Sequence, residues 1–310
     1  MGHEEILLDT GTNEVEILEF IVGGQNFGIN VAKVQQIIPF EKEKVTAVPN
    51  SESTIIGVIP WQESPVNLIE LSTILETQKV DSPWPVVLIT NFNGITNGFL
   101  VDEINRIHRV SWNQINPLNV YLRNCTEYAT GSIRLEEKDI ILVDFEFIIS
   151  AIFPETKMSY DVESFQEEVV QPRRENVKIV FAEDSVFIRK AITDFLEKVG
   201  FNVTNFENGE DAFKFIKDAY DKAKVSGGDI SEQVELVVSD IEMPQMDGLT
   251  LCRKIKEDLK IPNLPVIIFS SLINEQMSYK CKQVGADAYI TKPKSKELVG
   301  IIDNFLTAKK

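Results

Sequence analysis

Hydrophobic residues are spaced differently in the two halves of the chain. Between residues 15 and 152, short apolar runs alternate with turn residues, which is typical of short strands. The clearest runs are at residues 17–22, 85–90, 98–101 and 140–144. Gly23-Gly24, Asn93-Gly94 and Asn97-Gly98 predict turns between strands, and only short helices are expected, at 31–38 and 145–153. Many short strands with glycine-rich turns predict an all-β barrel or sandwich.

From residue 176 onward, apolar strands alternate with amphipathic helices. The strands are predicted at residues 177–182, 202–206, 236–239, 266–270 and 288–291, and the helices at 186–199, 210–220, 248–259, 274–284 and 295–306. Strands that are apolar almost throughout are buried on both faces, so this half is predicted to be an α/β domain with a five-stranded parallel sheet. Residues 154–175, with two prolines and many charges, predict a linker, and residues 222–233 predict a polar loop.

Five acidic, hydroxyl or amino side chains lie where these strands end. Glu183 and Asp184 follow the first strand, Asp240 follows the third, Ser270 ends the fourth and Lys292 follows the fifth. The carboxyl ends of parallel strands share one edge of a sheet, so these side chains are predicted to converge in one cleft. Three carboxylates in a cleft repel each other unless a cation lies between them, and their oxygens suit Mg²⁺.

This set of residues predicts phosphoryl transfer to an aspartate. Asp240 is placed centrally, where it can attack a phosphoryl donor and form an acyl phosphate. Mg²⁺ held by Glu183, Asp184, Asp240 and the backbone carbonyl of Glu242 would neutralise the phosphoryl oxygens. Lys292 would add a positive charge on a further oxygen.

Residues 176–310 resemble a response-regulator receiver domain of the CheY-like, flavodoxin-like fold. Besides the strand-end residues, the resemblance rests on Met243-Pro244, Asp247-Gly248, Gly285-Ala286-Asp287 and Lys292-Pro293. It implies a cis peptide bond before Pro293. It also implies that Ser270, which would donate a hydrogen bond to the phosphoryl group, and Tyr289 form the switch pair. Such a domain accepts a phosphoryl group from a kinase and is not itself expected to be an enzyme.

Two residues depart from the common receiver pattern. Glu183 stands where aspartate is frequent, which is a tolerated change. Glu242 places an acidic side chain beside the acceptor, and we expect it to slow the attack of water on the acyl phosphate. An acyl-phosphate half-life that is unchanged in Glu242→Ala would contradict this expectation.

The first half shows no catalytic constellation, because Asp102, Glu103 and His108 have no nucleophile beside them. Residues 15–153 instead resemble the CheW-like adaptor domain, which implies an all-β double barrel. The resemblance is carried by an ordered series of segments at residues 19–22, 26–37, 65–71, 98–104, 130–133 and 140–144.

One segment of the first half departs from that family. Pro60-Trp61-Gln62-Glu63 replaces an Asn-Leu-Arg-Gly turn, whose arginine is associated with receptor or kinase contact. Gln62 lacks the charge and the fork geometry of that arginine. Receptor coupling is therefore expected to be weak, differently directed or routed through other surfaces, or this half is a folded β module whose binding has degraded.

Composition and charge argue against several other functions. A net charge of −17 disfavours nucleic-acid binding, no apolar run is long enough to span a membrane, and the acidic start is unlike a secretory leader. Cys125, Cys252 and Cys281 are scattered, so they are expected to be reduced thiols. His3 and His108 are poor material for a zinc site, and His108 lies in an alternating run where a structural role is expected.

Together the two resemblances imply a bacterial cytoplasmic protein of chemoreceptor arrays. Its first half would bridge methyl-accepting chemoreceptors to the histidine kinase CheA, with other CheW-like proteins as further partners. Its second half would accept a phosphoryl group from the kinase at Asp240 and thereby tune the bridge. The candidate contact residues of the first half are Ile37, Ile38, Val58, Ile59 and Gln62.

Two other functions are also compatible with the sequence. The second half could be a phosphate sink that drains CheA, while the first half only localises it. Asp240 could also be the nucleophile of a phosphatase, although haloacid-type phosphatases carry their acid pair after the first strand, as DxD. Fast phosphotransfer without an effect on the kinase would favour the sink, and turnover of a phosphomonoester would favour the phosphatase.

Overall fold

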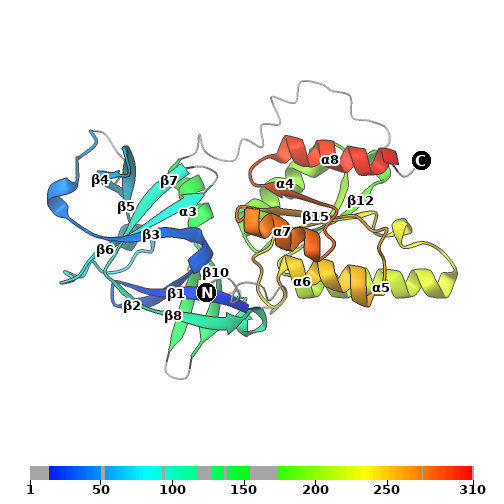
Figure 1. The fold of residues 1–310 in the computed structure, drawn as a ribbon, viewed down its shortest axis with the longest axis horizontal. Coiled ribbons are helices and arrows are strands. Elements are labelled where there is room, and N and C mark those ends of the chain that lie inside the picture. The colour runs from blue at the N-terminus through cyan, green and yellow to red at the C-terminus, as the bar shows by residue number, and fades with distance from the viewer. Residues whose placement is uncertain are drawn as a thin grey trace, which may run out of the picture. The chain divides into compact units, whose positions relative to one another are not determined.

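The chain divides into two units near residue 156, and each unit is described by itself. The computed structural model describes residues 14–49, 53–92, 95–117, 128–135, 138–153, 174–273 and 275–308. We refer to residues 14–153 as the first unit and to residues 174–308 as the second unit. In Figure 1, strands make up most of the first unit, and helices surround a sheet in the second.

Four sequence predictions concern residues outside the described ranges. These are the turn at Asn93-Gly94, the thiol of Cys125, the terminal His3 and residues 154–173 of the predicted linker. The end of that predicted linker, from Arg174 onward, forms a 3-10 turn at the start of the second unit.

Short strands and short helices build the first unit. The strands are β1 (Glu14–Val22), β2 (Gln25–Asn30), β3 (Val34–Pro39), β4 (Ile55–Trp61), β5 (Ser64–Glu70), β6 (Val86–Phe92), β7 (Ile95–Val101), β8 (Glu103–Ser111), β9 (Ile115–Asn116), β10 (Ala129–Arg134) and β11 (Asp139–Val143). The helical segments are the 3-10 turns η1 (Val31–Lys33), η2 (Lys42–Lys44) and η3 (Trp112–Gln114) and the α-helices α1 (Leu71–Ile74) and α3 (Phe145–Ile152). The four apolar runs singled out in the sequence correspond, to within one residue at their ends, to parts of β1, β6, β7 and β11.

These strands form two sheets, with the orders β8-β1-β2-β11-β10-β9 and β3-β6-β7-β5-β4. Apolar residues from both sheets and from α3 share one core, in which the rings of Phe99 and Phe145 meet edge-on with centres 4.6 Å apart. The sheets agree with the predicted all-β fold. Closure of each sheet into a barrel stays a prediction, because no strand pairing in the described ranges joins the edge strands of either sheet.

The predicted helix at residues 31–38 is wrong. Asn30 does start a helical segment, since its side chain accepts a hydrogen bond from the backbone N–H of Ala32, but the segment is only the turn η1. The rest of the range belongs to β3, which pairs antiparallel with β6. β-Branched residues such as Val34 and Ile37 favour strands, and pairing with β6 satisfies the backbone of this segment.

The predicted turn at Asn97-Gly98 is also wrong, because both residues lie inside β7. Gly98 pairs with Ile89 of β6, and a Cβ atom at this glycine would lie 2.7 Å from Cγ1 of Val87. This glycine therefore allows close packing between neighbouring strands. Gly23-Gly24 does connect β1 to β2 as predicted, with left-handed φ angles of 60° and 75°.

The second unit alternates strands and helices. Its strands are β12 (Lys178–Ala182), β13 (Asn202–Phe206), β14 (Leu236–Ser239), β15 (Val266–Ser270) and β16 (Ala288–Thr291). Its α-helices are α4 (Val186–Lys198), α5 (Gly209–Ser226), α6 (Gly248–Arg253), α7 (Glu275–Gln283) and α8 (Ser295–Ala308). Shorter helical segments are the 3-10 turns η4 (Arg174–Asn176) and η5 (Ile230–Glu232) and the π-helical η6 (Lys254–Asp258), which continues α6.

The sheet of the second unit has the order β13-β12-β14-β15-β16, and all neighbours are parallel. One apolar core lies on each face, with α4 and α8 against one face and α5, α6 and α7 against the other. The predicted five-stranded parallel sheet is therefore confirmed. Two details differ, because α5 runs on to Ser226 into the predicted loop and the helix after β14 becomes π-helical at Lys254.

The cysteines of the second unit are structural. Cys252 and Cys281 are buried and form no disulfide, as predicted. Burial raises the pKa of each thiol to about 12, which keeps both thiols protonated and unreactive.

A buried ion cluster holds β1 to its neighbours in the first unit. Glu19 is fully buried, its Oε2 lies 2.7 Å from Nε2 of His108 on β8, and its Oε1 accepts a hydrogen bond from Nζ of Lys138. His108 thus has a structural partner, in line with the expectation from its alternating run. Burial by itself raises the pKa of Glu19, but hydrogen bonds from His108, Lys138 and Asn105 outweigh burial and hold that pKa below its ordinary value.

We predict that Glu19→Gln lowers the free energy of unfolding of the first unit by about 1–3 kcal/mol at neutral pH, because two donors lose a charged acceptor. The pKa of Glu19 is lowered in the folded state, so ionised Glu19 contributes its full stabilisation above the pKa of the unfolded state. This stabilisation is lost as the pH falls through the pKa of the folded state. The difference between the variant and the natural sequence should therefore shrink as the pH falls below the ordinary value of 4.5.

Urea unfolding followed by tryptophan fluorescence measures this effect in the first unit alone, because Trp61, Trp84 and Trp112 are the three tryptophans of the chain. Glu16→Gln, at an exposed position of the same strand, controls for the loss of one negative charge. An equal loss of stability in both variants would contradict the role of the cluster.

Candidate functional site

The carboxyl ends of the parallel strands bring the predicted site residues together. Glu183 and Asp184 follow β12, Asp240 follows β14 and Lys292 follows β16. Nζ of Lys292 lies 2.7 Å from Oδ2 of Asp240 and 2.7 Å from Oε2 of Glu183. One carboxylate oxygen from each of the three acids lies within 4.8 Å of the others. The convergence that the sequence predicted is thus a property of the structure.

These charged groups are almost fully buried. Glu183 is 0% exposed, Asp240 is 4% exposed and Lys292 is 1% exposed. Burial disfavours the charged form of Glu183 and raises its pKa well above the ordinary value; Lys292 opposes this shift, while Asp240 and Asp184 add to it. Three acids around one lysine leave an excess of negative charge, which a cation would relieve.

The donor set fits a hard divalent cation. Oε1 of Glu183 is buried and accepts no hydrogen bond within the described part of the chain, so this oxygen can serve as a ligand. The three acidic side chains offer oxygen atoms close enough to contact a single ion, and Mg²⁺ prefers such ligands. The predicted ligand from Glu242 is its backbone carbonyl, which stays a prediction; the residue itself is 6% exposed, in the loop after Asp240.

The backbone around Asp240 is shaped by the Asp247-Gly248 pair. A Cβ atom at Gly248 would lie 1.9 Å from the carbonyl oxygen of Asp240, so only glycine fits at this position. Asp247 caps α6 by accepting hydrogen bonds from the backbone N–H of Thr250 at 2.9 Å and from its hydroxyl at 2.6 Å. This motif therefore fixes the loop that presents Asp240.

The predicted switch residues lie on neighbouring strands. Ser270 ends β15, is 1% exposed and accepts a hydrogen bond at 3.4 Å from the backbone N–H of Leu272. Tyr289 of β16 pairs with Ile268 of β15, is half-buried and packs against the core on the α5–α7 face. The Lys292–Pro293 peptide bond is cis, as the resemblance implied. Movement of Ser270 and Tyr289 on phosphorylation stays a prediction.

The candidate contact residues of the first unit lie on β3, on β4 and in the turn after β4. Ile38, Ile59 and Gln62 line one cavity of about 380 Å³. Ile37 precedes Ile38 on β3, so strand alternation places it on the other face, where it is 41% exposed. Val58 is half-buried on β4. The five residues therefore belong to two adjoining surfaces and do not form a single patch.

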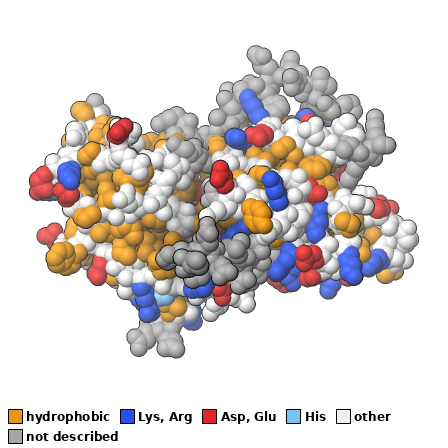
Figure 2. Space-filling model, viewed as in Figure 1, with side chains coloured by type: hydrophobic (Ala, Val, Ile, Leu, Met, Phe, Trp, Pro, Cys, Tyr) orange, Lys and Arg blue, Asp and Glu red, His pale blue; other side chains and the backbone are white. Residues whose placement is uncertain are grey.

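The edge of this cavity carries a strained turn. Trp61 lines the cavity, and its Nε1 donates a hydrogen bond to Oε1 of Gln36 at 2.8 Å. Gln62 follows at the tip of the β4–β5 hairpin with a φ of 43°, a left-handed value that residues other than glycine rarely adopt. Figure 2 shows hydrophobic side chains gathered over the first unit around the place of β3 in Figure 1. Strain and exposed apolar surface are both common at binding sites.

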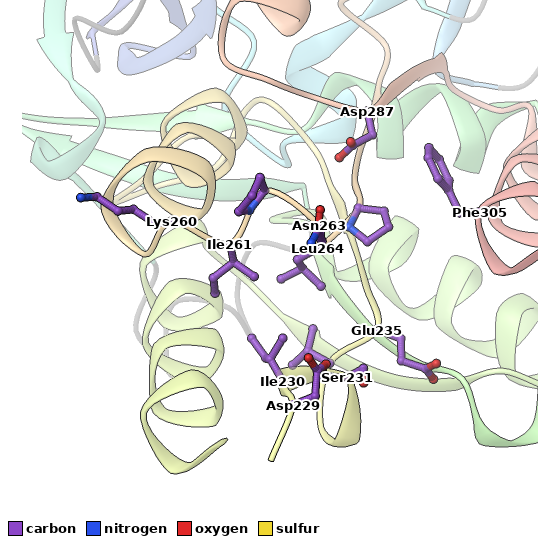
Figure 3. A pocket seen from close by; sticks show the side chains of 13 residues that line it. Asp229, Ile230, Ser231, Glu235, Lys260, Ile261, Asn263, Leu264, Asp287 and Phe305 are labelled. Carbon is purple, nitrogen blue, oxygen red and sulfur yellow. Dashed lines mark hydrogen bonds between the residues drawn. The ribbon is translucent and has the colours of Figure 1, made fainter. Parts of the chain in front are cut away.

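A second cavity, of about 710 Å³, lies in the second unit at the edge opposite the carboxylates. Figure 3 shows Asp287 and Ile230 on opposite sides of it. Its acidic groups are already engaged, since Glu235 accepts a hydrogen bond from the backbone N–H of Lys178 and Asp287 accepts one from Nζ of Lys256. Both carboxylates therefore serve contacts within the second unit.

Lys256 joins three segments at this amino-terminal edge of the sheet. Its Nζ donates hydrogen bonds to the carbonyl oxygens of Pro262 at 3.0 Å and Leu264 at 2.8 Å, and to the carboxylate of Asp287 at 2.7 Å. Asp287 in turn accepts a hydrogen bond from the backbone N–H of Val266, the first residue of β15. One ammonium group thus fastens η6 to the starts of β15 and β16.

Sequence reasoning missed one residue beside the carboxylates. Arg189 of α4 donates hydrogen bonds from Nη1 to the carbonyl oxygens of Glu183 and Asp184. Ser185 caps α4, and Arg189 lies one helical turn beyond it, so the side chain can reach back toward the loop. The spacing of one helical turn between Ser185 and Arg189 could have indicated this contact from the sequence.

Comparisons with known proteins assign a domain type to each unit. Residues 16–153 match the CheW-like domain, and residues 179–303 match the response regulator receiver domain. The chain is 32% identical to chemotaxis protein CheW of Klebsiella aerogenes, over 44% of this chain and 82% of that protein. The crystal structure of scaffolding protein TtCheW from Thermoanaerobacter tengcongensis aligns with 42% of this chain and 83% of its own, at 19% identity and a TM-score of 0.39.

The fold and the site therefore define a two-component signalling protein of chemotaxis that joins a CheW-like domain to a receiver domain. Over 93% of its length, the chain is 30% identical to chemotaxis protein CheV3 of Helicobacter pylori, of which it covers 94%. The chain belongs to the CheV family of chemotaxis proteins. Receiver domains generally bind Mg²⁺, and both domain types are generally not enzymes. Within the described ranges, no helix is long and apolar enough to cross a membrane.

We predict that Gly248→Ala destabilises the second unit by about 1–3 kcal/mol, because the new methyl group collides with the carbonyl of Asp240. Gly300→Ala is the matched control, since Gly300 lies in α8 with open space around its Cβ position. This control should gain about 0.5–1 kcal/mol from the better helix former. Urea unfolding followed by far-ultraviolet circular dichroism checks both variants, and equal stability of the two would contradict the role given to Gly248.

Proposed function

We propose that this protein couples chemoreceptors to the histidine kinase CheA, and that a phosphoryl group on Asp240 tunes the coupling. The proposal rests on the cluster of Glu183, Asp184, Asp240 and Lys292 in a chain whose other unit belongs to the CheW-like family. The first unit would hold the protein in the receptor–kinase complex. The second unit would carry a covalent mark that reports the activity of the kinase.

In the phosphoryl transfer, a carboxylate oxygen of Asp240 attacks the phosphorus of a phosphohistidine. The phosphorus–nitrogen bond breaks as the phosphorus–oxygen bond forms, and the leaving imidazole takes up a proton. Lys292, whose Nζ lies 2.7 Å from Asp240, would neutralise charge on the transferred group. Glu183 and Asp184, with Asp240, would hold Mg²⁺, which neutralises the phosphoryl oxygens.

The signal would leave this site through Ser270 and Tyr289. We propose that the Ser270 hydroxyl turns from its contact with the Leu272 N–H and donates a hydrogen bond to the phosphoryl group. Tyr289, on the neighbouring strand β16, would repack together with α7 and α8. The change would alter the surface of the second unit and thereby the coupling.

The receptor or kinase would contact the first unit at β3 and β4. Ile37 offers an exposed apolar side chain, and the adjoining cavity offers Ile38, Ile59 and Trp61 as apolar lining. Gln62 stands at the rim of this cavity, where its amide can form hydrogen bonds but not an ion pair. Apolar contacts would then carry the affinity of this surface.

Co-sedimentation with receptor signalling fragments and CheA tests this function. The experiment is run with and without Mg²⁺ and beryllofluoride, which mimics the acyl phosphate, and the kinase rate is measured in the pellet. We expect the protein to join the complex, and the bound amount or the kinase rate to shift with the mimic. Asp240→Asn should join the complex without responding to the mimic.

A phosphate sink is the second candidate function, and Gln62 favours it because its amide cannot replace the charge of arginine. In that case the protein accepts phosphoryl groups from CheA at Asp240, whether or not it joins the complex, and the kinase rate does not respond to the mimic. A protein that joins the complex and is phosphorylated, yet leaves binding and kinase rate unchanged, would contradict the proposed tuning.

We predict that Ile37→Ser weakens binding to the receptor–kinase complex about fivefold or more, because truncation of a hot-spot residue at the centre of an interface costs more than about 1 kcal/mol. Ile107→Ser is the matched control, since Ile107 is 54% exposed on the edge strand β8. The control should bind like the natural sequence. Equal binding of the two variants in the co-sedimentation assay would exclude β3 as the contact surface.

A further inference from the structure

Arg189 joins the helix α4 to the loop that carries two of the acids. Its Nη1 lies 2.6 Å from the carbonyl oxygen of Glu183 and 3.0 Å from the carbonyl oxygen of Asp184. Its Nη2 lies 4.0 Å from Oε2 of Glu207, in the loop after β13. The side chain is 13% exposed, so these contacts form in a largely water-free environment.

The two carbonyl groups belong to the peptide units on either side of Asp184. A planar guanidinium that binds both of them fixes the orientation of both peptide units, and with them the direction in which the Asp184 side chain leaves the backbone. The backbone N–H of Glu183 is held separately, by the carbonyl of Phe206 at 3.0 Å. The loop is thus restrained from two sides before any ligand arrives.

We infer that Arg189 is a positioning residue, which holds the loop of Glu183 and Asp184 in the conformation that binds a divalent cation. The inference rests on the proposed function. The two hydrogen bonds from Nη1 act on the backbone of this loop. The positive charge of Arg189 would repel a cation and weaken its binding. The hydrogen bonds from Arg189 to the backbone would instead hold the loop in place and strengthen cation binding, so the two effects have opposite signs.

Binding of Mn²⁺ to the full chain distinguishes these effects. Mn²⁺ takes the same oxygen ligands as Mg²⁺, and the free ion is quantified by its electron paramagnetic resonance signal. We expect Arg189→Gln to bind Mn²⁺ about tenfold more weakly, the usual scale for loss of a residue that supports metal ligands. Arg189→Lys should recover part of this affinity, because one ammonium can still reach a carbonyl.

Lys190→Gln is the matched control, because Lys190 is the next residue of α4, is exposed and carries the same charge. It should bind Mn²⁺ like the natural sequence. Asp184→Asn sets the background of non-specific binding to this acidic chain. An unfolding curve in the presence of a chelator shows whether each variant is folded. If Arg189→Gln does not fold, Arg189→Lys still tests the positioning role.

Equal or tighter Mn²⁺ binding by Arg189→Gln, with the natural sequence binding above background, would overturn the positioning role. The positioning role would also be overturned if Arg189→Lys and Lys190→Gln both lost as much Mn²⁺ affinity as Arg189→Gln. Failure of the natural sequence itself to bind Mn²⁺ above the Asp184→Asn background would instead count against the proposed function. The two failures are therefore distinguishable.

Discussion

The buried ammonium group of Lys292 constrains the fold of the second unit. A lysine that is 1% exposed is stable only beside opposite charges, and it has two, at 2.7 Å on Asp240 and at 2.7 Å on Glu183. These three residues follow three different strands. The strands must therefore end in register, which a parallel sheet with helices on both faces provides. Gly248 and Arg189 then fix the loops on which the acids are carried.

The first unit follows a different principle. Its fully buried carboxylate, Glu19, is paired with His108 and Lys138 and serves the fold. The exposed apolar side chain of Ile37 lies on β3, and the strained Gln62 lies in the turn after β4. Such a surface suits recognition better than chemistry. The proposed division of labour between a reactive unit and a binding unit agrees with where each unit keeps its charges.

Periodicity in the sequence was enough to predict the second unit, because parallel strands are apolar on both faces and stand out between amphipathic helices. Convergence of Glu183, Asp240 and Lys292 then followed from topology alone. The wrong predictions in the first unit have a common cause, because the structure of each segment depends on a neighbouring strand that is distant in the sequence. Residues 34–39 became β3 through pairing with β6, and Gly98 was explained by Val87 on the neighbouring strand.

Side-chain partners were the hardest features to predict. Glu19 is separated from His108 by 89 positions and from Lys138 by 119, and no local pattern connects them. Arg189 was within reach of prediction, since it lies one turn beyond the cap of α4, but its target is a pair of backbone carbonyls, which leave no trace in a sequence. The contact surface of the first unit stays a prediction, and alternation along β3 divides its candidate residues between two faces.

Lys256 has a mechanical consequence for the second unit. By binding the carbonyls of Pro262 and Leu264 and the carboxylate of Asp287, it clamps one end of β15 and β16. The other ends of the same two strands carry Ser270 and Lys292. A strand that is held at one end is displaced most at its other end. A rearrangement at the carboxyl edge would therefore pivot about the Lys256 end, and its displacement would grow toward the surface formed by the start of α7 and the start of α8.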